Sequence, residues 1–422
     1  MTRLTSRSRI TRSRIRVFCF GLAAALLLVL VPGGAAAKPA RLPKAPAGKN
    51  FYSPPAKLIK GKPGTAIWIR KTTGLARPPL AGRVLTIAYR STSIRDRATV
   101  MSGTIALPKG KPPKGGWPIV TFGHVTTGSA DDCAPSRVTA ASTEFERMVR
   151  SNEFVGYLLG HGVAVARPDF EGIGTPGRHP YMIGRSLGRS MIDIIRAGRQ
   201  LDIGLGRRWA AAGHSEGGQA ALFTAKIGPR RAPGLSFRGV SAFAPASHVS
   251  DFVELARSFD TPSPLTDGFS GLGALILEGA AIAEPSLWQE YRDGGLSAEA
   301  LELMPDTQRL CLADLSGTGS FGAMPPGALE GPDGPQVLPE VYAVLDRNDP
   351  RTLSLPGVPV RLDQGSKDLV VWQSQTAEVA DVLESKGAEV NYEVWPGADH
   401  TDITDLDYAA SASADWLIDL LR

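Results

Sequence analysis

The sequence predicts an α/β fold with a mostly parallel sheet and a helical cap insertion. Three observations favour this class. From about residue 117, short apolar runs alternate with helical segments, which is typical of a parallel sheet flanked by helices. Between about 250 and 355 only helical segments follow one another, and the alternation resumes at 358. A G-x-S-x-G pentapeptide, residues 213–217, joins one apolar run to one helical segment.

Residues 1–37 have the three parts of a secretory signal peptide. Six arginines between positions 3 and 16 form its basic start, residues 17–31 its apolar run, and alanines 35–37 its cleavage site. The apolar run is shorter than the roughly 20 residues of a membrane-spanning helix, which favours cleavage over a retained anchor. We therefore expect a secreted, extracellular protein once residues 1–37 are removed.

The excess of positive charge belongs to this leader. The chain has 47 basic and 41 acidic residues, and removal of the six leader arginines leaves the two numbers equal. The net charge therefore gives no support to a nucleic-acid partner or to an anionic membrane. Nothing in the sequence indicates the oligomeric state.

The elements can be assigned in order along the chain. Residues 38–50, rich in Pro, Ala and Lys without an apolar period, predict a flexible tether. We assign 51–249 and 356–422 to the sheet-containing core and 250–355 to the helical cap. Strands are expected at 65–70, 83–89, 98–107, 118–122, 162–166, 209–212, 239–243, 358–362 and 390–395, the first three antiparallel. Helices are expected at 142–159, 186–201 and 219–226, and in the cap at 265–283, 287–292 and 298–304.

The pentapeptide predicts the nucleophile elbow of an α/β-hydrolase fold. In this turn the serine, here Ser215, is held at a strained strand-to-helix junction so that its hydroxyl is exposed. Gly213 and Gly217, two residues before and after it, avoid crowding between the strand and the helix. A chance glycine turn is the alternative, because 47 of the 422 residues are glycine. The flanking strand and helix favour the elbow.

A serine nucleophile needs a base, and two histidines follow Ser215 in the chain. In this fold the acid comes between the serine and the histidine. His248 follows the elbow too closely to leave room for an acid-bearing strand, whereas His400 follows the strand at 390–395. We therefore expect His400 to be the base.

The acid is expected in the loop after the preceding strand, where two aspartates are close together. Asp363 falls within the strand run, and Asp368 lies beyond Gly365, where a side chain can reach His400. We favour Asp368, with Asp363 as the second choice. Asp399, adjacent to His400, is interpreted as a solvated turn residue.

An oxyanion hole requires two backbone N–H groups directed at the developing charge. One is expected from Glu216, the residue after the nucleophile, and the other from Val125 or Thr126 in the loop after the strand at 118–122. His124 is interpreted as a hydrogen-bonded residue that shapes this loop rather than as a catalytic group.

A second motif, residues 172–177, matches the G-x-G-x-x-G pattern of dinucleotide sites. Such a site needs a helix that begins within the glycines, but Pro176 and Pro180 postpone any helix. We therefore interpret 172–177 as a loop, with Asp169 and Glu171 before it as structural residues, and expect no cofactor. No spacing of histidines or cysteines predicts a metal site.

Two cysteines remain after the leader is removed. Cys133 and Cys311 form an even pair in an oxidising compartment, which favours a disulfide over two buried free thiols.

With these residues in place, the chain resembles the secretory lipase family of α/β-hydrolases, which includes lipase-A-type enzymes, from about Phe51 to the C-terminus. The resemblance is carried by Gly115-Gly116-Trp117-Pro118, His124 with Thr126-Thr127-Gly128, Cys133-Ala134-Pro135-Ser136, the segments at 169–177 and 213–218, and the regions of Asp368 and His400. Bacterial relatives usually have His-Gly-Thr-Thr-Gly, and Val125 replaces that glycine here. A β-branched residue resists positive φ and narrows the pocket.

The resemblance implies a catalytic triad of Ser215, Asp368 and His400, a cap over the site, and a disulfide from Cys133 into the cap at Cys311. It also implies hydrolysis of carboxylic esters, including acylglycerols, through an acyl-enzyme, with an ester or lipid as substrate and a lipid–water interface as a potential partner. Two alternatives are a peptidase or amidase on the same fold, and a non-catalytic binding protein on a hydrolase scaffold.

Overall fold

The computed structural model describes residues 42–422 except 262, 264, 265 and 267, and these residues belong to one compact unit. The predicted signal peptide and the first part of the predicted tether lie outside the described residues. The described part of the tether ends in a 3-10 helix, η1 (Gly48–Phe51), and Leu42 packs against the core. Within the described residues, no helix combines the length and apolar character that crossing a membrane requires.

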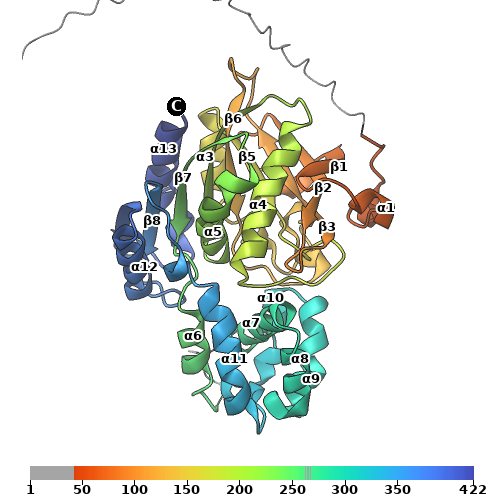
Figure 1. Ribbon diagram of the computed structural model, residues 1–422, viewed down its shortest axis with the longest axis vertical. Helices are drawn as coiled ribbons and strands as arrows, with labels where there is room; N and C mark the ends of the chain where they lie inside the picture. The colour runs from red at the N-terminus through yellow and green to blue at the C-terminus, as the bar shows by residue number, and fades with distance from the viewer. Residues whose placement is uncertain (1–41, 262, 264–265, 267) are drawn as a thin grey trace, which may run out of the picture. The chain divides into compact units, whose positions relative to one another are not determined.

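The described residues form one mixed sheet in the order β1-β2-β3-β5-β4-β6-β7-β8-β9 (Figure 1). Its strands are β1 (Thr65–Lys71), β2 (Arg83–Thr92), β3 (Ala98–Leu107), β4 (Trp117–Gly123), β5 (Ala164–Pro168), β6 (Leu205–His214), β7 (Ser236–Phe243), β8 (Pro359–Gly365) and β9 (Glu389–Trp395). The strands from β1 to β3 pair antiparallel, as does β3 with β5, and the pairs from β5 to β9 are parallel. The predicted fold class, a mostly parallel sheet with an antiparallel start, is confirmed.

Helices cover both faces of the sheet because alternate residues of the central strands point to opposite faces. On β6, Trp209 and Ala211 join one apolar core, and Ala210 and Ala212 join another. The first core includes residues of α4 (Gly184–Arg199), α5 (Glu216–Arg231) and α12 (Gln373–Ser385), and the second includes residues of α3 (Asn152–Gly160) and α13 (Ala409–Leu421). A short helix, α1 (Ala56–Ile59), precedes the sheet.

The helix predicted at 142–159 is two helices in the structure. Helix α2 (Phe145–Val149) and α3 are separated by Ser151, which adopts a left-handed conformation with φ 64°. Met148 in α2 packs into the first core, whereas Phe154 in α3 packs into the second. A single straight helix cannot place both apolar groups, so the chain turns between them.

The segment between β7 and β8 is helical and has an apolar core of its own. Its helices are α6 (Val249–Ala256), α7 (Phe269–Ala283), α8 (Leu287–Glu290), α9 (Ala298–Leu303), α10 (Leu312–Leu315) and α11 (Gly334–Arg347). The predicted start of α7, Leu265, lies outside the described residues. We call this segment the cap.

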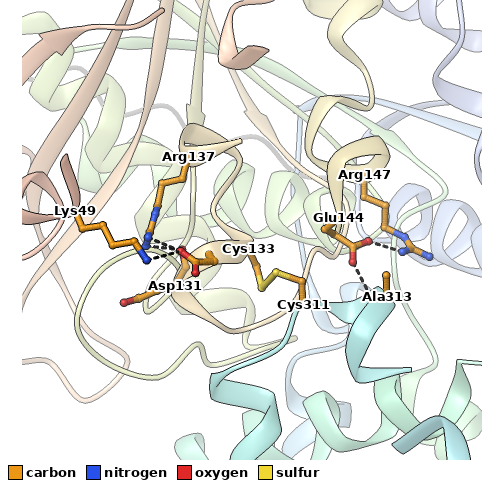
Figure 2. Close-up of a disulfide and its surroundings, with 9 residues drawn as sticks. Lys49, Asp131, Cys133, Arg137, Glu144, Arg147, Cys311 and Ala313 are labelled. Atoms are coloured by element: carbon orange, nitrogen blue, oxygen red, sulfur yellow. Dashed lines mark hydrogen bonds and ion pairs between the residues drawn. A yellow bond between two sulfur atoms is a disulfide. The ribbon is translucent and has the colours of Figure 1, made fainter. Parts of the chain in front are cut away.

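The predicted disulfide between Cys133 and Cys311 is present and joins the loop after β4 to the residue before α10 (Figure 2). A polar contact lies beside it. The buried carboxylate of Glu144 accepts a hydrogen bond from the Ala313 N–H at 2.7 Å and pairs with Arg147. The core is thus attached to the first turn of α10 by one covalent and one charged contact.

Candidate active site

Ser215 lies at a tight turn in which positions 213 and 217 have room only for glycine. It connects β6 to α5 with φ 56° and ψ −117°, a strained conformation for a residue with a side chain. A Cβ atom on Gly213 would lie 2.0 Å from the carbonyl oxygen of Gly217, and one on Gly217 would lie 2.0 Å from that of Gly123. The strand, the turn and the neighbouring strand β4 therefore approach one another at backbone contact.

Asp368 and His400 meet across the loops that follow β8 and β9. The Nδ1 atom of His400 lies 2.7 Å from Oδ2 of Asp368, and it donates because the carboxylate is the acceptor. The other carboxylate oxygen accepts the N–H groups of Val370 and Val371 at 2.8 and 2.9 Å, and Gln364 donates to Oδ2 at 3.1 Å. These bonds fix the carboxylate and leave Nε2 of His400 free to act as a base or an acid.

His214, the residue before the serine, brings His400 next to the elbow. Its ring centroid lies 4.8 Å from that of His400. Burial, followed by the nearby charge of His400, holds the pKa of His214 well below its ordinary value. A neutral His214 ring therefore acts as a packing surface for His400.

A pocket of about 440 Å³ contains both Ser215 and His400. The serine hydroxyl makes no hydrogen bond with another described residue. The cap contributes apolar lining: Phe252, Leu255, Phe269, Leu272 and Ile276. The loop after Asp368 contributes Leu369, Val370 and Trp372 at the rim, where the side chain of Leu369 is 78% exposed. The pocket thus combines a nucleophile and a histidine with an apolar interior and an apolar rim.

The predicted oxyanion donors face no competing acceptor. Within the described chain, no hydrogen bond uses the N–H of Glu216, Val125 or Thr126. Val125 and Thr126 both line the pocket. Val125 is absent from the described non-glycine residues with positive φ, so its branched side chain imposes no left-handed strain, although it does occupy pocket space.

The side chain of His124 orients this loop. Its Nδ1 donates to the carbonyl of Val125 at 2.7 Å. Because a trans peptide places the next N–H opposite the carbonyl, the Thr126 N–H points away from the His124 ring. Burial, which outweighs the attraction of Glu216, lowers the pKa of His124.

The remaining candidates make hydrogen bonds with residues outside the proposed triad. Asp363 lies within β8, where it accepts from Arg361 at 2.7 and 2.9 Å and from the Trp395 indole at 2.9 Å. Asp399 is exposed and accepts the N–H groups of residues 401 and 402 within its turn. His248 begins α6 and contacts Ser247 and Glu378.

Residues 172–177 form a loop, as expected, with Gly172 and Gly174 at positive φ. Asp169 before it accepts from Ser102 at 2.6 Å and from both the N–H and the hydroxyl of Ser136, which ties β5 to neighbouring segments. No group of three or more His, Cys, Asp or Glu residues in the described part of the chain is arranged to hold a metal ion.

Sequence reasoning missed four side chains that support the site. His214 is visible in the pentapeptide, but nothing there predicts its contact with His400. Gln364 lies only four residues before Asp368, but no local pattern indicates their contact. His179 and Tyr181 carry no sequence signal, because their partners Glu216 and Thr126 lie on other segments of the fold.

Solved structures of lipases and esterases have a fold similar to that of this chain. Lipase A of Candida antarctica is 20% identical, with a TM-score of 0.72 over 89% of this chain and 88% of that chain. The rice cell wall degrading esterase LipA of Xanthomonas oryzae is 18% identical, with a TM-score of 0.67 over 86% of this chain and 100% of that chain. At such identities the likeness establishes the fold. A comparison with curated protein sequences finds no match.

The family described as Secretory lipase matches residues 135–422, which include the elbow, the cap and the loops of Asp368 and His400. This match spans more than half of the chain and confirms the resemblance inferred from the sequence motifs. The protein therefore belongs to the secretory lipase family, and it is a carboxylic ester hydrolase with the α/β-hydrolase fold.

Proposed function

We propose that the protein is a secreted serine hydrolase that cleaves esters of apolar acyl chains, with Ser215 as nucleophile, His400 as general base and acid, and Asp368 as the residue that orients His400. The observation that carries the proposal is the 2.7 Å hydrogen bond between Asp368 and His400 at the pocket that contains Ser215. A serine of ordinary reactivity becomes a nucleophile when such a pair takes its proton.

In the first half of the reaction, the Ser215 oxygen attacks the ester carbonyl carbon and its proton moves to Nε2 of His400. Asp368 holds Nδ1–H and stabilises the resulting imidazolium. The negative charge that develops on the carbonyl oxygen is stabilised by the N–H of Glu216 and a second N–H from the loop after β4. The orientation of the Val125 carbonyl favours Thr126 as that second donor.

In the second half, the tetrahedral intermediate collapses, the ester C–O bond breaks, and the departing alcohol takes the proton from His400. Water then attacks the acyl-enzyme while His400 accepts a proton from it. A second collapse releases the carboxylic acid and returns the proton to Ser215. The three side chains are unchanged at the end of the cycle, and the net change is one ester and one water converted to an acid and an alcohol.

The lining of the pocket supports an apolar acyl group as the part of the substrate that the cap binds. Phe252, Phe269 and Leu272 supply apolar surface from α6 and α7, and burial of each methylene contributes about 0.8 kcal/mol. The exposed Leu369 and Trp372 at the rim support contact with a lipid–water interface, because water disfavours a clustered apolar surface.

The proposal includes export, with the first 37 residues removed as a signal peptide. The basic, apolar and small-residue parts of this segment support it, as does the name of the family. When the full chain is expressed in a secreting host, the protein recovered from the culture medium should have an N-terminal sequence that begins at residue 38. Retention of residues 1–37 on the exported protein would contradict this part of the proposal.

The experiment that tests the catalytic proposal is the Ser215→Ala variant, assayed on p-nitrophenyl esters of short and long acyl chains. We expect kcat to fall by about 10⁴-fold or more and labelling by a fluorophosphonate probe to disappear. Ser247→Ala is the matched control, because Ser247 is also buried and lines the same pocket. It should keep both labelling and activity. Equal turnover by Ser215→Ala and the wild type would end the proposal.

A further inference from the structure

The two N–H groups assigned to the oxyanion come from different parts of the fold. Glu216 begins α5, whereas Thr126 lies in the loop after β4. A donor is effective when it lies about 2.7–3.1 Å from the oxyanion, so the spacing between the two donors matters as much as their presence. One segment contacts both. It follows β5 and includes His179 and Tyr181, neither of which the triad uses.

His179 holds the side chain of Glu216. Its Nε2 lies 2.9 Å from Oε1 of Glu216, and both side chains are 1% exposed. Its Nδ1 lies 2.8 Å from the carbonyl of Glu171 and must donate there, because a carbonyl oxygen only accepts. The ring therefore has one fixed orientation, with Nε2 directed at Glu216.

The charges around this pair favour a charged bond. Burial lowers the pKa of His179, but the charge of Glu216 and the hydrogen bonds to Glu216 and the Glu171 carbonyl together raise it above its ordinary value. Burial lowers the pKa of the neighbouring His124, and His124 makes no hydrogen bond to the Glu216 carboxylate. His179 is thus the partner that fixes the residue carrying the first oxyanion donor.

Tyr181 holds the other side of the oxyanion hole. Its hydroxyl lies 2.8 Å from the hydroxyl of Thr126, and both residues are buried. The N–H of Tyr181 donates to the carbonyl of His179 at 2.9 Å, so the two side chains project from one tight turn. On the outer side, helix α7 of the cap passes so close that a Cβ atom on Gly279 would lie 2.3 Å from the Tyr181 carbonyl oxygen.

From these contacts we infer that His179 and Tyr181 are positioning residues of the oxyanion hole, which set the spacing between the Glu216 and Thr126 N–H groups through side-chain hydrogen bonds. The inference rests on the proposed function and deepens it. Tyr181 lines the pocket that contains Ser215, but both residues are assigned a role that acts through Glu216 and Thr126. Their effect is expected on the transition state, where the charge appears, rather than on substrate binding.

Tyr181→Phe is the sharpest test, because it removes one hydroxyl and keeps the ring. We expect kcat to fall by about 10-fold and KM to stay within about 2-fold of the wild-type value. This loss is smaller than the roughly 10²–10³-fold decrease in kcat that follows removal of an oxyanion-hole donor itself. The inhibition constant of an alkyl boronic acid, which forms a tetrahedral anion on the serine, should rise by the same factor as kcat falls.

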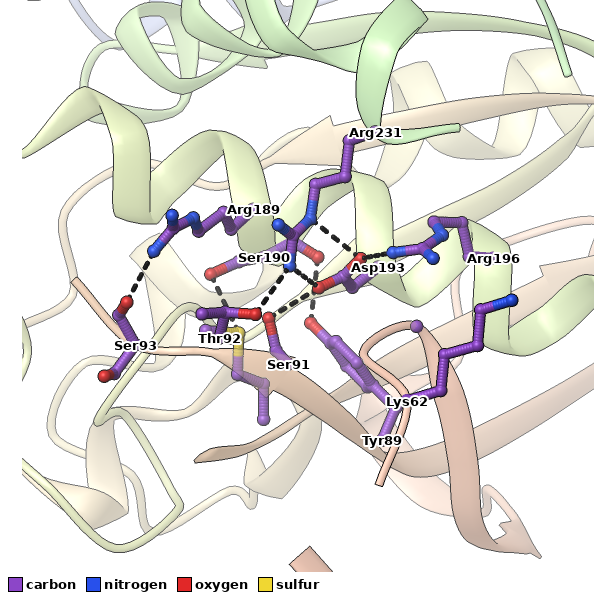
Figure 3. A network of polar contacts seen from close by, with 12 residues as sticks. Lys62, Tyr89, Ser91, Thr92, Ser93, Arg189, Ser190, Asp193, Arg196 and Arg231 are labelled. Atoms are coloured by element: carbon purple, nitrogen blue, oxygen red, sulfur yellow. Dashed lines mark hydrogen bonds and ion pairs between the residues drawn. The ribbon is translucent and has the colours of Figure 1, made fainter. Parts of the chain in front are cut away.

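Tyr89→Phe is the matched control. Tyr89 is also buried and its hydroxyl makes one hydrogen bond, to the carbonyl of Ser190 at 2.9 Å, in the polar network shown in Figure 3. It lies on β2, which contributes no residue to the pocket that contains Ser215. Tyr89→Phe should lower the melting temperature about as much as Tyr181→Phe and leave kcat and boronic acid affinity unchanged.

His179 is tested by a pair of variants. His179→Ala removes the partner of Glu216, and kcat should fall by about 100-fold with KM little changed. His179→Gln can still donate from its amide to Glu216, so it should recover part of that loss. If the His179 variants do not fold, Tyr181→Phe with its Tyr89→Phe control decides the question alone.

Two results would overturn the inference. One is a Tyr181→Phe enzyme with wild-type kcat and wild-type boronic acid affinity, and the other is a kcat loss that Tyr89→Phe reproduces. Failure of the underlying proposal is recognised separately, because an active Ser215→Ala enzyme would contradict the triad whatever Tyr181→Phe does. An inactive Ser215→Ala enzyme together with normal Tyr181→Phe kinetics would reject the positioning role alone.

Discussion

The two halves of the candidate site are held by different forces. The half with Ser215 and Glu216 lies where β6, β4 and α5 meet, with glycine backbones at contact and the buried hydrogen-bonded pair of His179 and Glu216 behind it. The half with Asp368 and His400 lies on loops at the C-terminal ends of β8 and β9, beside apolar side chains that face solvent. The first is fixed mainly by backbone packing and the second mainly by side-chain hydrogen bonds.

Because of this difference, we expect substitutions in the two halves to differ in how strongly they affect folding stability and catalytic rate. A change at the glycines of the serine half must disturb the packing of strands and helix, so it should affect folding and activity together. A change in the acid and histidine half removes hydrogen bonds from loops, and the sheet beneath can remain as it is. Each prediction below tests one side of this contrast.

The largest effect is expected in the loop half, at Asp368. In Asp368→Asn the residue no longer carries the charge that orients His400, and kcat should fall by about 10⁴-fold while the melting temperature changes little. Asp363→Asn is the matched control, since Asp363 contacts Arg361 and Trp395 instead of His400. It should keep kcat within about 3-fold and lower the melting temperature, because it weakens a buried ion pair. Steady-state kinetics and thermal unfolding of both variants measure the contrast, and the reverse pattern would exchange the two roles.

In both halves, the sequence could predict the features that depend on neighbouring residues and missed the contacts between distant ones. The elbow at Ser215 is a local backbone requirement, so five residues and their flanks indicate it. The choice of Asp368 over Asp363 depends on where a strand ends, which the residues around Gly365 indicate. The pairing of His179 with Glu216 spans 37 positions, and no local pattern encodes it.

The same limit explains the split between α2 and α3. Their apolar residues share one helical period in the sequence, yet they pack into cores on opposite faces of the sheet. Hydrophobic periodicity predicts which side chains are buried, but it does not predict into which apolar core each of them packs. The family and fold class could be predicted because they depend on several motifs in order rather than on one contact.

The disulfide is the next test, because it attaches the cap to the serine half. Cys133→Ser/Cys311→Ser should lower the free energy of unfolding by about 2–4 kcal/mol, since the bond closes a loop of 178 residues. Activity on short esters should remain within a few-fold, because neither cysteine lines the pocket that contains Ser215. Urea unfolding measures the loss. Reductant should lower the free energy of unfolding of the wild type and leave that of the double variant unchanged, so the double variant is also the control for this treatment.

Gly217→Ala tests the packing of the serine half directly. The added methyl would lie 2.0 Å from the Gly123 carbonyl oxygen, and relief of that clash requires movement of β4 or α5. We expect about 1–3 kcal/mol of lost stability together with a lower kcat. Gly319→Ala is the control, since nothing lies within 4 Å of its added methyl. A stable Gly217→Ala enzyme with normal kcat would show that the contact is looser than the structure indicates.

The smallest effect concerns selectivity, at Val125 beside the elbow. Val125→Ala opens space next to the scissile bond without relieving backbone strain, because Val125 has no positive φ. The preference for α-branched over linear acyl esters, measured as a ratio of kcat/KM values, should rise by about 10-fold, within the range for one or two methyl groups. Val370→Ala removes the same atoms from the exposed rim and should leave that ratio unchanged. An equal rise of this ratio in both variants would show that side chains at the rim, in the loop half, also determine acyl selectivity. It would weaken the assignment of the serine half to recognition of the reacting carbonyl.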